Sequence, residues 1–186
     1  PCPFAHVNLQ GEIDMKKYAF GVDVGGTTVK IGLFSVDGAL ESSWEIPTRR
    51  EDGGTWSLRD IAASLYAECQ NRGIEKNEIS GIGLGVPGAV LDDRIVNRCV
   101  NLGWGVVNVA EEMERLTGVS NIKAANDANV AALGEIWQGG GKGYRNMVML
   151  TLGTGVGGGV ILDGKIVSGA FGAGGEIGHF RMSNLV

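Results

Sequence analysis

The sequence predicts an α/β fold of two related lobes, in which short buried strands alternate with amphipathic helices. Apolar runs of strand length alternate with segments whose apolar residues recur at helical spacing. The order strand, glycine turn, strand, Asp-Gly turn, strand also occurs twice, with the Asp-Gly turns at 37–38 and 163–164. A repeat this long is no solenoid period, and two facing lobes enclose a cleft suited to a ligand.

Composition narrows the class of protein. The 186 residues carry a net charge of −5, with 44% hydrophobic and 20% charged residues, as in ordinary globular proteins. No cluster of Lys and Arg offers the electrostatic footprint of a nucleic-acid-binding protein. No apolar run is long enough to span a membrane and no signal-peptide pattern is present, so we expect a cytoplasmic protein without a membrane partner. Three cysteines without CxxC spacing predict neither a disulfide framework nor a metal site of their own.

The first lobe is expected to span residues 16–126, after a leader of residues 1–15 that lacks periodicity and is left out of the fold. Apolar and alternating runs separated by Gly-Gly and Asp-Gly pairs predict a three-stranded meander. Apolar residues at helical spacing, each series ended by a glycine, predict two helices, the second capped by Asn108. The expected strands are Tyr18–Val24, 27–36, 40–46, Ile79–Val86 and 122–125, and the first helix is Ser57–Arg72.

The second lobe is expected to span residues 127–186 and to repeat the strand pattern after one helix. Its apolar strand runs are separated by a long glycine-rich stretch and then by an Asp-Gly turn. The expected helix is Asp127–Gln138, the strands are Met147–Leu152, 160–162 and 165–168, and the glycine-rich turn is 153–159.

The segment DVGGTTVK, residues 23–30, has the composition of an anion-binding turn. Its two glycines let backbone N–H groups approach an anion, and its two threonines add hydroxyl donors. The aspartate directs a carboxylate to the same space, which suits Mg²⁺ at a nucleotide phosphate. Taken alone, the segment is equally compatible with a plain hairpin turn. The candidate phosphate-site residues are Asp23, Gly25, Gly26, Thr27 and Thr28.

The segment LTLGTGVGGGVI, residues 150–161, repeats this composition in the second lobe, with five glycines in twelve residues. Thr154 is a hydroxyl donor for a phosphate, and Gly153 and Gly155 free the backbone around it. A bulged hairpin is the structural alternative. Neither glycine segment matches the GxxxxGK[ST] loop. As a pair at equivalent positions of the repeat, they predict two phosphate-facing turns, one per lobe.

The segment AANDANVAALGE, residues 124–135, leads a strand into a helix through Asn126 and Asp127. An Asp at a helix start is commonly an N-cap, and that alternative stays open. The functional hypothesis is a general base: Asp127 accepts the proton of an attacking hydroxyl, while Asn126 hydrogen-bonds a neighbouring hydroxyl.

Two loop motifs add polar side chains. GGEIGH contributes Glu176 and His179 after a glycine-rich loop that no helix or strand requires. NLGW places Asn101 and Trp104 on a loop, where the structural alternative is a core Trp that anchors the loop. Lone Glu and His residues are otherwise solvated or buried in the core. Together with the Asn-Asp pair, however, these side chains form a polar set that can bind a polyol.

Read together and in order, these motifs resemble the ROK family of bacterial sugar kinases and regulators, most closely its glucokinase branch. The resemblance covers about residues 18–180 and rests on DVGGTTVK, GIGLGVPGAV, NLGW, NDANVAALGE, LTLGTGVGGGVI and GGEIGH. It implies an actin-like, hexokinase-type ATPase fold with duplicated ribonuclease H-like lobes, the second lobe truncated. It also implies ATP-dependent, Mg²⁺-assisted phosphorylation of a hexose, such as glucose to glucose 6-phosphate.

The resemblance assigns a role to each motif. Asp127 matches the catalytic base for the sugar 6-hydroxyl. The loops around residues 23–28 and 153–157 match those that hold the ATP phosphates. The implied sugar contacts are Gly88, Asn101, Asn126, Asp127, Glu176 and His179.

The family pattern continues after the EIGH-type motif with cysteines that bind a structural zinc together with that histidine. It then supplies the adenine pocket and a last helix that returns to the first lobe. This chain ends at Val186, seven residues after His179. We therefore expect zinc, and a homodimer or higher homo-oligomer, only in the complete protein, and an inactive 186-residue chain. Apolar surface should be exposed, or covered by self-association, at Leu150, Leu152, Val160 and Ile161.

Three alternatives were compared with a glucokinase. A sugar-responsive transcriptional regulator of the same family would carry an N-terminal helix-turn-helix of several tens of residues. Only 17 residues precede the first strand here, and Asp127 is retained, so the kinase is favoured. A non-sugar actin-like ATPase needs no polyol pocket. A kinase for another hexose, such as N-acetylmannosamine, allose or fructose, fits the motifs equally, because each sugar presents a hydroxyl to the base.

Overall fold

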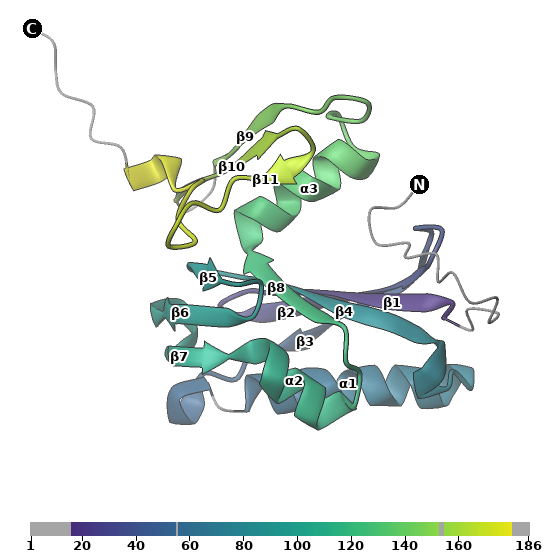
Figure 1. Ribbon diagram of the computed structural model, residues 1–186. Helices are drawn as coiled ribbons and strands as arrows, with labels where there is room; N and C mark the ends of the chain where they lie inside the picture. The colour runs from purple at the N-terminus through teal and green to yellow at the C-terminus, as the bar shows by residue number, and fades with distance from the viewer. Residues whose placement is uncertain (1–15, 55, 153–154, 180–186) are drawn as a thin grey trace, which may run out of the picture.

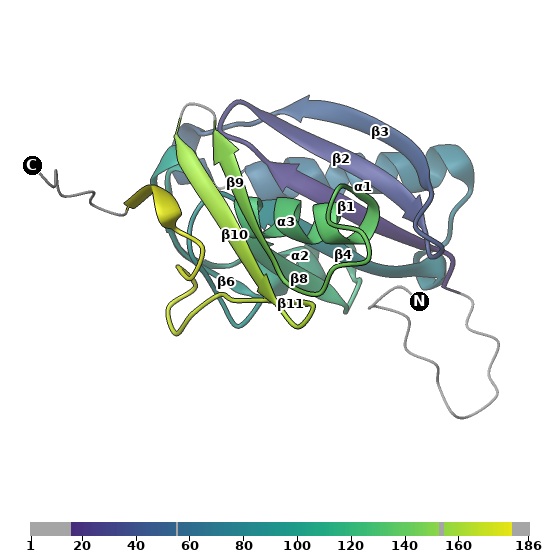
Figure 2. The same ribbon diagram turned by 90° about the horizontal axis from the view of Figure 1, so that it is seen from above.

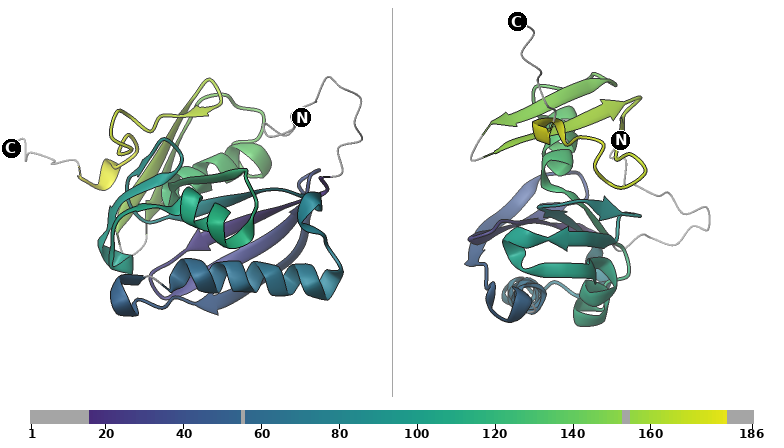
Figure 3. Two further views of the ribbon diagram at one scale, coloured as in Figure 1. Left: turned by 60° about the horizontal axis from the view of Figure 1, so that its bottom comes forward. Right: turned by 90° about the vertical axis from the view of Figure 1, so that its left-hand side faces the viewer.

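The computed structural model describes residues 16–54, 56–152 and 155–179. For the description, residues 16–126 are called the N-terminal unit and residues 127–179 the C-terminal unit, and Figure 1 shows the second lying above the first. Two helices lie below a five-stranded sheet, and a third helix separates that sheet from a three-stranded sheet, as the end-on view in Figure 3 shows. The molecule is therefore layered, with helix α3 between two sheets.

The five-stranded sheet has the strand order β3-β2-β1-β4-β8. The first three strands form an antiparallel meander, whereas β4 and β8 run parallel to β1. In β1 the burial alternates, since Phe20, Val22 and Val24 point into the core. The predicted strands are confirmed, with bounds β1 Tyr18–Val24, β2 Thr28–Ser35, β3 Leu40–Pro47, β4 Ile79–Val86 and β8 Ile122–Asn126.

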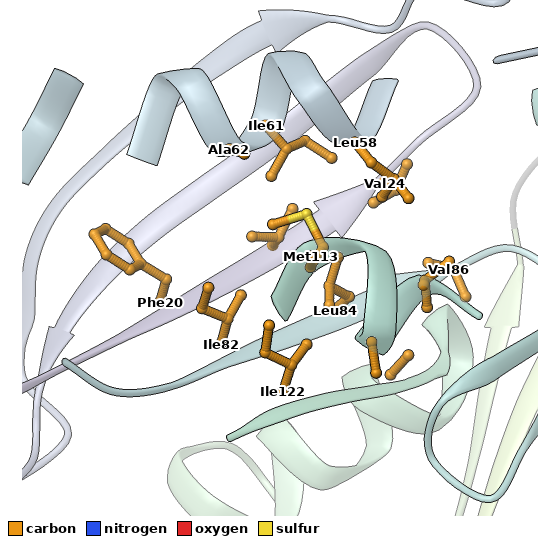
Figure 4. Packing of buried hydrophobic residues seen from close by; sticks show 14 of the residues in the cluster. Phe20, Val24, Leu58, Ile61, Ala62, Ile82, Leu84, Val86, Met113 and Ile122 are labelled. Atoms are coloured by element: carbon orange, nitrogen blue, oxygen red, sulfur yellow. The ribbon is translucent and has the colours of Figure 1, made fainter. Parts of the chain in front are cut away.

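Helices α1 (Ser57–Arg72) and α2 (Val109–Thr117) cover one face of this sheet. Figure 4 shows their apolar side chains meeting those of the strands, and Ile61 and Met113 are fully buried there. The predicted cap of α2 is confirmed, because Asn108 accepts a hydrogen bond from the N–H of Glu111 at 3.1 Å. No helix within the described ranges combines the length and the apolar character needed to cross a membrane.

A second, small sheet lies between β4 and α2 in the sequence and was not predicted. It has the order β5-β6-β7, with β5 Val90–Leu91, β6 Ile95–Cys99 and β7 Trp104–Asn108. These strands are too short for an alternating pattern to identify them. Trp104 is buried and its Nε1–H donates to the carbonyl of Gly54 at 3.0 Å, so the alternative of an anchoring core Trp is confirmed.

The C-terminal unit consists of α3 (Asp127–Gln138) and an antiparallel sheet of order β11-β10-β9. The predicted turn at 153–159 is wrong in its second part, because β10 already begins at Val156. A Cβ on Gly159 would lie 2.6 Å from the Cβ of Ala132, so this glycine lets β10 lie directly on α3. The strands are β9 Met147–Leu152, β10 Val156–Leu162 and β11 Lys165–Ile166.

Only one face of this three-stranded sheet is covered by the helix. Leu150 and Leu152 are 56% and 80% exposed, as expected from the sequence, and Val160 is half-buried. The expectation for Ile161 is wrong, because its side chain is 0% exposed. Successive strand residues point to opposite faces, and Ile161 belongs to the face that packs on α3.

Candidate active site

Two carboxylates of the predicted site converge where the parallel strands end. The carboxyl ends of β1, β4 and β8 share one edge of the sheet, where ligands of open α/β sheets commonly bind. Asp23 of β1 is paired in register with Gly85 of β4. A Cβ on Gly85 would lie 3.8 Å from the Cα of Asp127, the first residue of α3. At this distance, which is an ordinary van der Waals contact, Asp127 lies next to the strand residue that pairs with Asp23.

The charge of Asp127 acts on two neighbouring groups. Partial desolvation raises the pKa of the Asp23 carboxyl, and the Asp127 charge raises it further against the opposing effect of Lys30. Burial raises the pKa of the Cys99 thiol, hydrogen bonds from the backbone of Leu102 and Asn101 oppose this, and Asp127 adds to it. The end of β1, the loop after β6 and the start of α3 thus face one another. Two carboxylates here fit Mg²⁺ by donor chemistry, since this cation prefers oxygen ligands.

The N-cap of α3 is a different residue from the one that the sequence alternative named. Asn126, not Asp127, caps α3, because its Oδ1 accepts from the N–H groups of Ala128 and Asn129 at 3.0 and 3.2 Å. Its Nδ2 donates to the carbonyl of Gly88 at 3.2 Å. Asp127 occupies the first helical position with an exposed side chain, where the helix dipole favours its negative charge. Asn126 therefore fixes the start of α3, whereas Oδ1 of Asp127 shares the N–H of Ala128 at 2.8 Å and its side chain remains exposed.

Gly88 lies in the turn after β4, at a position that only glycine fits. Its φ is +121°, and a Cβ there would lie 3.1 Å from the carbonyl oxygen of Arg98 and 3.8 Å from the Cβ of Cys99. The turn consequently packs on β6. This contact brings Gly88 to the same region as Cys99, two residues before Asn101.

The turn between β1 and β2 has the features of an anion site. The N–H of Gly25 donates to the carbonyl of Thr28 at 3.0 Å, and a Cβ on Gly26 would lie 4.0 Å from the carbonyl oxygen of Asn101. Thr27 is exposed. Among hydrogen bonds between described residues, none uses the N–H of Gly26 or Thr27. Two backbone donors next to the NLGW loop are thus available to a ligand.

The second predicted phosphate turn is described only in part. Gly153 and Thr154 lie outside the described residues. Gly155 is exposed, and a Cβ there would meet no atom within 4 Å. The end of β9 and the start of β10 lie at the same end of the molecule as the turn between β1 and β2, as Figures 1 and 2 agree. The two glycine segments therefore belong to one end of the molecule.

Gly175, the residue before Glu176, packs closely on β10 and on Asn129 of α3. A Cβ on Gly175 would lie 2.4 Å from the carbonyl oxygen of Gly158 and 3.1 Å from Oδ1 of Asn129. Glu176 itself is half-buried. His179 ends the short 3₁₀ helix Ile177–His179, and its side chain is outside the described part of the structure.

Sequence reasoning missed the role of Asn129 and of the glycine contact beneath Glu176. Asn129 is 4% exposed, and within the described residues its Oδ1 has no hydrogen-bond partner. Buried acceptors normally have a donor, so this atom marks a place where the described structure leaves a group to be satisfied. The signal available in the sequence was the second Asn of NDAN, the third residue of a helix whose start already carried two polar side chains.

Metal ligands are not grouped in the part of the chain that the structure describes. Within it, no three His, Cys, Asp or Glu residues lie close enough together to hold a metal ion. Because the imidazole of His179 is outside that part, the expectation of a zinc site in the complete protein stays a prediction.

Comparison with known proteins identifies relatives along nearly the whole chain. The model of the ROK family matches residues 19–185. A glucokinase of Halalkalibacterium halodurans is 43% identical over 167 residues, which are 89% of this chain and 50% of that protein. An N-acetyl-D-glucosamine kinase of Haemophilus influenzae is 33% identical over 88% of this chain and 52% of its own length. The chain thus spans about half the length of these curated relatives.

A solved structure supports the same grouping. The crystal structure of a ROK family glucokinase from Streptomyces griseus in complex with glucose and AMPPNP matches with a TM-score of 0.75 at 32% identity. The match covers 89% of this chain and 51% of that one. The predicted actin-like ATPase fold is confirmed by this match, with the chain covering about half of the complete fold.

Proposed function

The chain belongs to the ROK family, and from this premise we propose that the protein containing it transfers a phosphoryl group from ATP to a hexose, with glucose as the favoured acceptor. The observation that carries the proposal is the convergence of Asp127 with Asp23 at the edge where β1, β4 and β8 end. The N–H groups of Gly26 and Thr27 are available at the adjacent turn.

In the proposed reaction Asp127 is the general base. Its exposed carboxylate accepts the proton of the sugar 6-hydroxyl as that oxygen attacks the γ-phosphorus, while the bond from the γ-phosphorus to the β,γ-bridging oxygen breaks and ADP leaves. Asn126 keeps the carboxylate in place by capping α3, and through Gly88 it connects the base to the turn after β4. Capping restrains the first residue of the helix, so the base stays in position relative to the acceptor hydroxyl. Such positioning of the reacting groups favours catalysis.

Phosphate binding is proposed for the two glycine segments. The N–H groups of Gly26 and Thr27 and the hydroxyls of Thr27 and Thr28 supply hydrogen-bond donors from the N-terminal unit. The open surroundings of Gly155, with Gly153 and Thr154 beside it in the sequence, supply an approach from the C-terminal unit. Mg²⁺ bound with ATP supplies positive charge that offsets the charge of the phosphates, and Asp23 offers it an oxygen ligand.

The sugar is proposed to lie between the turn after β4 and the turn that carries Glu176. Gly88 and Asn101 would line one side, and Glu176 and His179 the other. The close contact of Gly175 with Gly158 and with Asn129 of α3 supports the second side, because Glu176 is the next residue in the chain. Hydroxyl groups of a hexose match carboxylate and amide partners of this kind.

A kinase for an N-acetylated amino sugar is the second candidate, favoured by the similarity to the Haemophilus influenzae N-acetyl-D-glucosamine kinase. The two candidates share the base and the phosphate turns and differ only in the sugar contacts.

An ADP-release assay on the protein containing this chain tests the proposal. Glucose, N-acetylglucosamine, N-acetylmannosamine, allose and fructose are compared, and 6-deoxyglucose serves as the matched control because it lacks the acceptor hydroxyl. We expect release that depends on the hexose, with the highest kcat/KM for glucose and none with 6-deoxyglucose. Release at one rate with or without sugar would contradict a sugar kinase, and a higher kcat/KM for an N-acetylated sugar would favour the second candidate.

A further inference from the structure

Thr48, which follows β3 and lies outside every motif of the sequence, makes two hydrogen bonds to the turn between β1 and β2. Its Oγ1 donates to the carbonyl of Gly25 at 2.7 Å, and its N–H donates to the carbonyl of Thr27 at 2.9 Å. The carbonyls on both sides of Gly26 are therefore held by one residue. Thr48 is half-buried, so these bonds are partly shielded from water.

Holding the carbonyl of Gly25 also sets the direction of the next N–H. In a trans peptide the C=O and the N–H point to opposite sides, and no peptide of the described chain is cis. With the carbonyl of Gly25 turned toward Thr48, the N–H of Gly26 must point away from Thr48. This is one of the two donors that no described residue engages.

The turn needs such a restraint because of its composition. Two adjacent glycines leave the backbone free to adopt many conformations. The N–H of Gly25 bonds within the turn at 3.0 Å, and a Cβ at Gly25 would lie 2.6 Å from the carbonyl oxygen of Thr28, so a stiffer residue does not fit. Rigidity must then come from outside the turn.

Thr48 can provide it because the chain on its other side is fastened to α1. The carbonyl of Arg49 accepts a hydrogen bond at 2.7 Å from Oγ of Ser57, which is 2% exposed. The guanidinium of Arg49 pairs with the carboxylate of Asp60, one turn further along α1. The turn is thereby connected through Thr48 to the main helix of the N-terminal unit.

We propose that Thr48 is a positioning residue for the nucleotide, which presets the N–H of Gly26 toward an ATP phosphate without touching the ligand itself. The inference rests on the proposed kinase function and deepens it by adding a residue that determines nucleotide affinity. It predicts that loss of the Thr48 hydroxyl weakens the binding of the nucleotide and leaves the binding of the sugar unchanged.

The test compares Thr48→Val, which removes the hydroxyl at nearly constant volume, with Thr48→Ser, which retains it. Thr117→Val is the matched control, because Oγ1 of Thr117 donates to the carbonyl of Met113 at 2.7 Å at the end of α2. Calorimetry measures the Kd of a non-hydrolysable ATP analogue and of glucose for the protein containing this chain, and thermal unfolding measures Tm.

We expect Thr48→Val to raise the nucleotide Kd roughly threefold to tenfold, the loss of about one hydrogen bond. The glucose Kd should not change, and Thr48→Ser should restore the native nucleotide Kd. Thr117→Val should lower Tm and leave both Kd values unchanged. The inference is overturned if the Thr48→Val variant binds the ATP analogue with the native Kd, or if Thr117→Val raises that Kd as much as Thr48→Val does. A native protein that binds no nucleotide would instead refute the proposed function, and the inference with it.

Discussion

The two sheets of the molecule bury their strands in different ways. In the N-terminal unit β1, β2 and β4 contribute side chains such as Leu33 and Leu84, which are 0% and 1% exposed beneath α1 and α2. In the C-terminal unit β9 alternates strictly between half-buried and exposed residues, and its outer face is apolar. The first sheet has a core of its own, whereas the second rests on a single helix.

This difference shows where the candidate site draws its rigidity. Asp127 begins α3, which packs on the three-stranded sheet and also touches the five-stranded sheet near Gly85. The residue before it, Asn126, belongs to the well-packed N-terminal unit and is hydrogen-bonded to Gly88 in the turn after β4. The C-terminal unit adds Glu176, whose neighbour Gly175 packs on Gly158 of β10. Catalysis and stability should therefore respond differently to changes in the two units.

The largest expected effect lies at the boundary between the units. In the protein containing this chain, Asp127→Asn should lower kcat roughly 10²–10⁴-fold, because an amide cannot accept the proton of the attacking hydroxyl. The Kd for the sugar should stay close to native, since an amide still hydrogen-bonds the ground-state hydroxyl. Asp163→Asn, in the exposed turn after β10, is the matched control and should keep native kcat. Near-native kcat for Asp127→Asn would remove this residue from the mechanism.

The next effect compares the two sheets directly. Leu84→Ala should lower the free energy of unfolding by about 2–5 kcal/mol, because the side chain fills the core between the sheet and its helices. Leu150→Ala should cost less than about 0.5 kcal/mol, since this side chain is 56% exposed. Urea denaturation of the two variants measures both values. An equal cost at the two positions would show that the outer face of β9 is covered in solution.

The smallest effect concerns Asp23 and pH. Folding raises the pKa of the Asp23 carboxyl, because the carboxylate is partly desolvated and faces the charge of Asp127. The protonated carboxyl does not have this cost. The native protein therefore loses stability as the pH rises through the raised pKa and Asp23 ionises. Asp23→Asn stays neutral and should therefore have a higher Tm than the native protein at pH 7. The gap should close as the pH falls below about 4, the ordinary range of an Asp carboxyl. Asp37→Asn, in the exposed turn after β2, controls for the loss of one negative charge. A gap that is the same at both pH values would contradict the electrostatic origin.

Local signals in the sequence were sufficient for most of the framework. The strands of the five-stranded sheet, all three α-helices and the cap at Asn108 follow from alternation, helical spacing and capping chemistry, which act over a few residues. The small sheet of β5, β6 and β7 did not, because strands of two to five residues carry too little pattern.

The candidate site shows the same division. Its motifs and their order were readable from the sequence, and so was the pairing of two glycine-rich segments. Which of the two residues Asn126 and Asp127 caps α3 was not readable, because either can accept the helix N–H groups. In the structure Asn126 is the cap, and its Nδ2 also donates to the carbonyl of Gly88, 38 residues away in the sequence.

By itself the sequence determined most of the elements, their order and the family, because backbone propensity, period and motif spacing are properties of short segments. Only the tertiary structure decided what several residues do within that framework. Gly159 allows β10 to lie on α3, and Thr48 holds the turn between β1 and β2, although neither position has a partner nearby in the sequence. The reason is physical: close packing and hydrogen bonds between distant segments depend on where whole layers meet, and no local pattern encodes that distance.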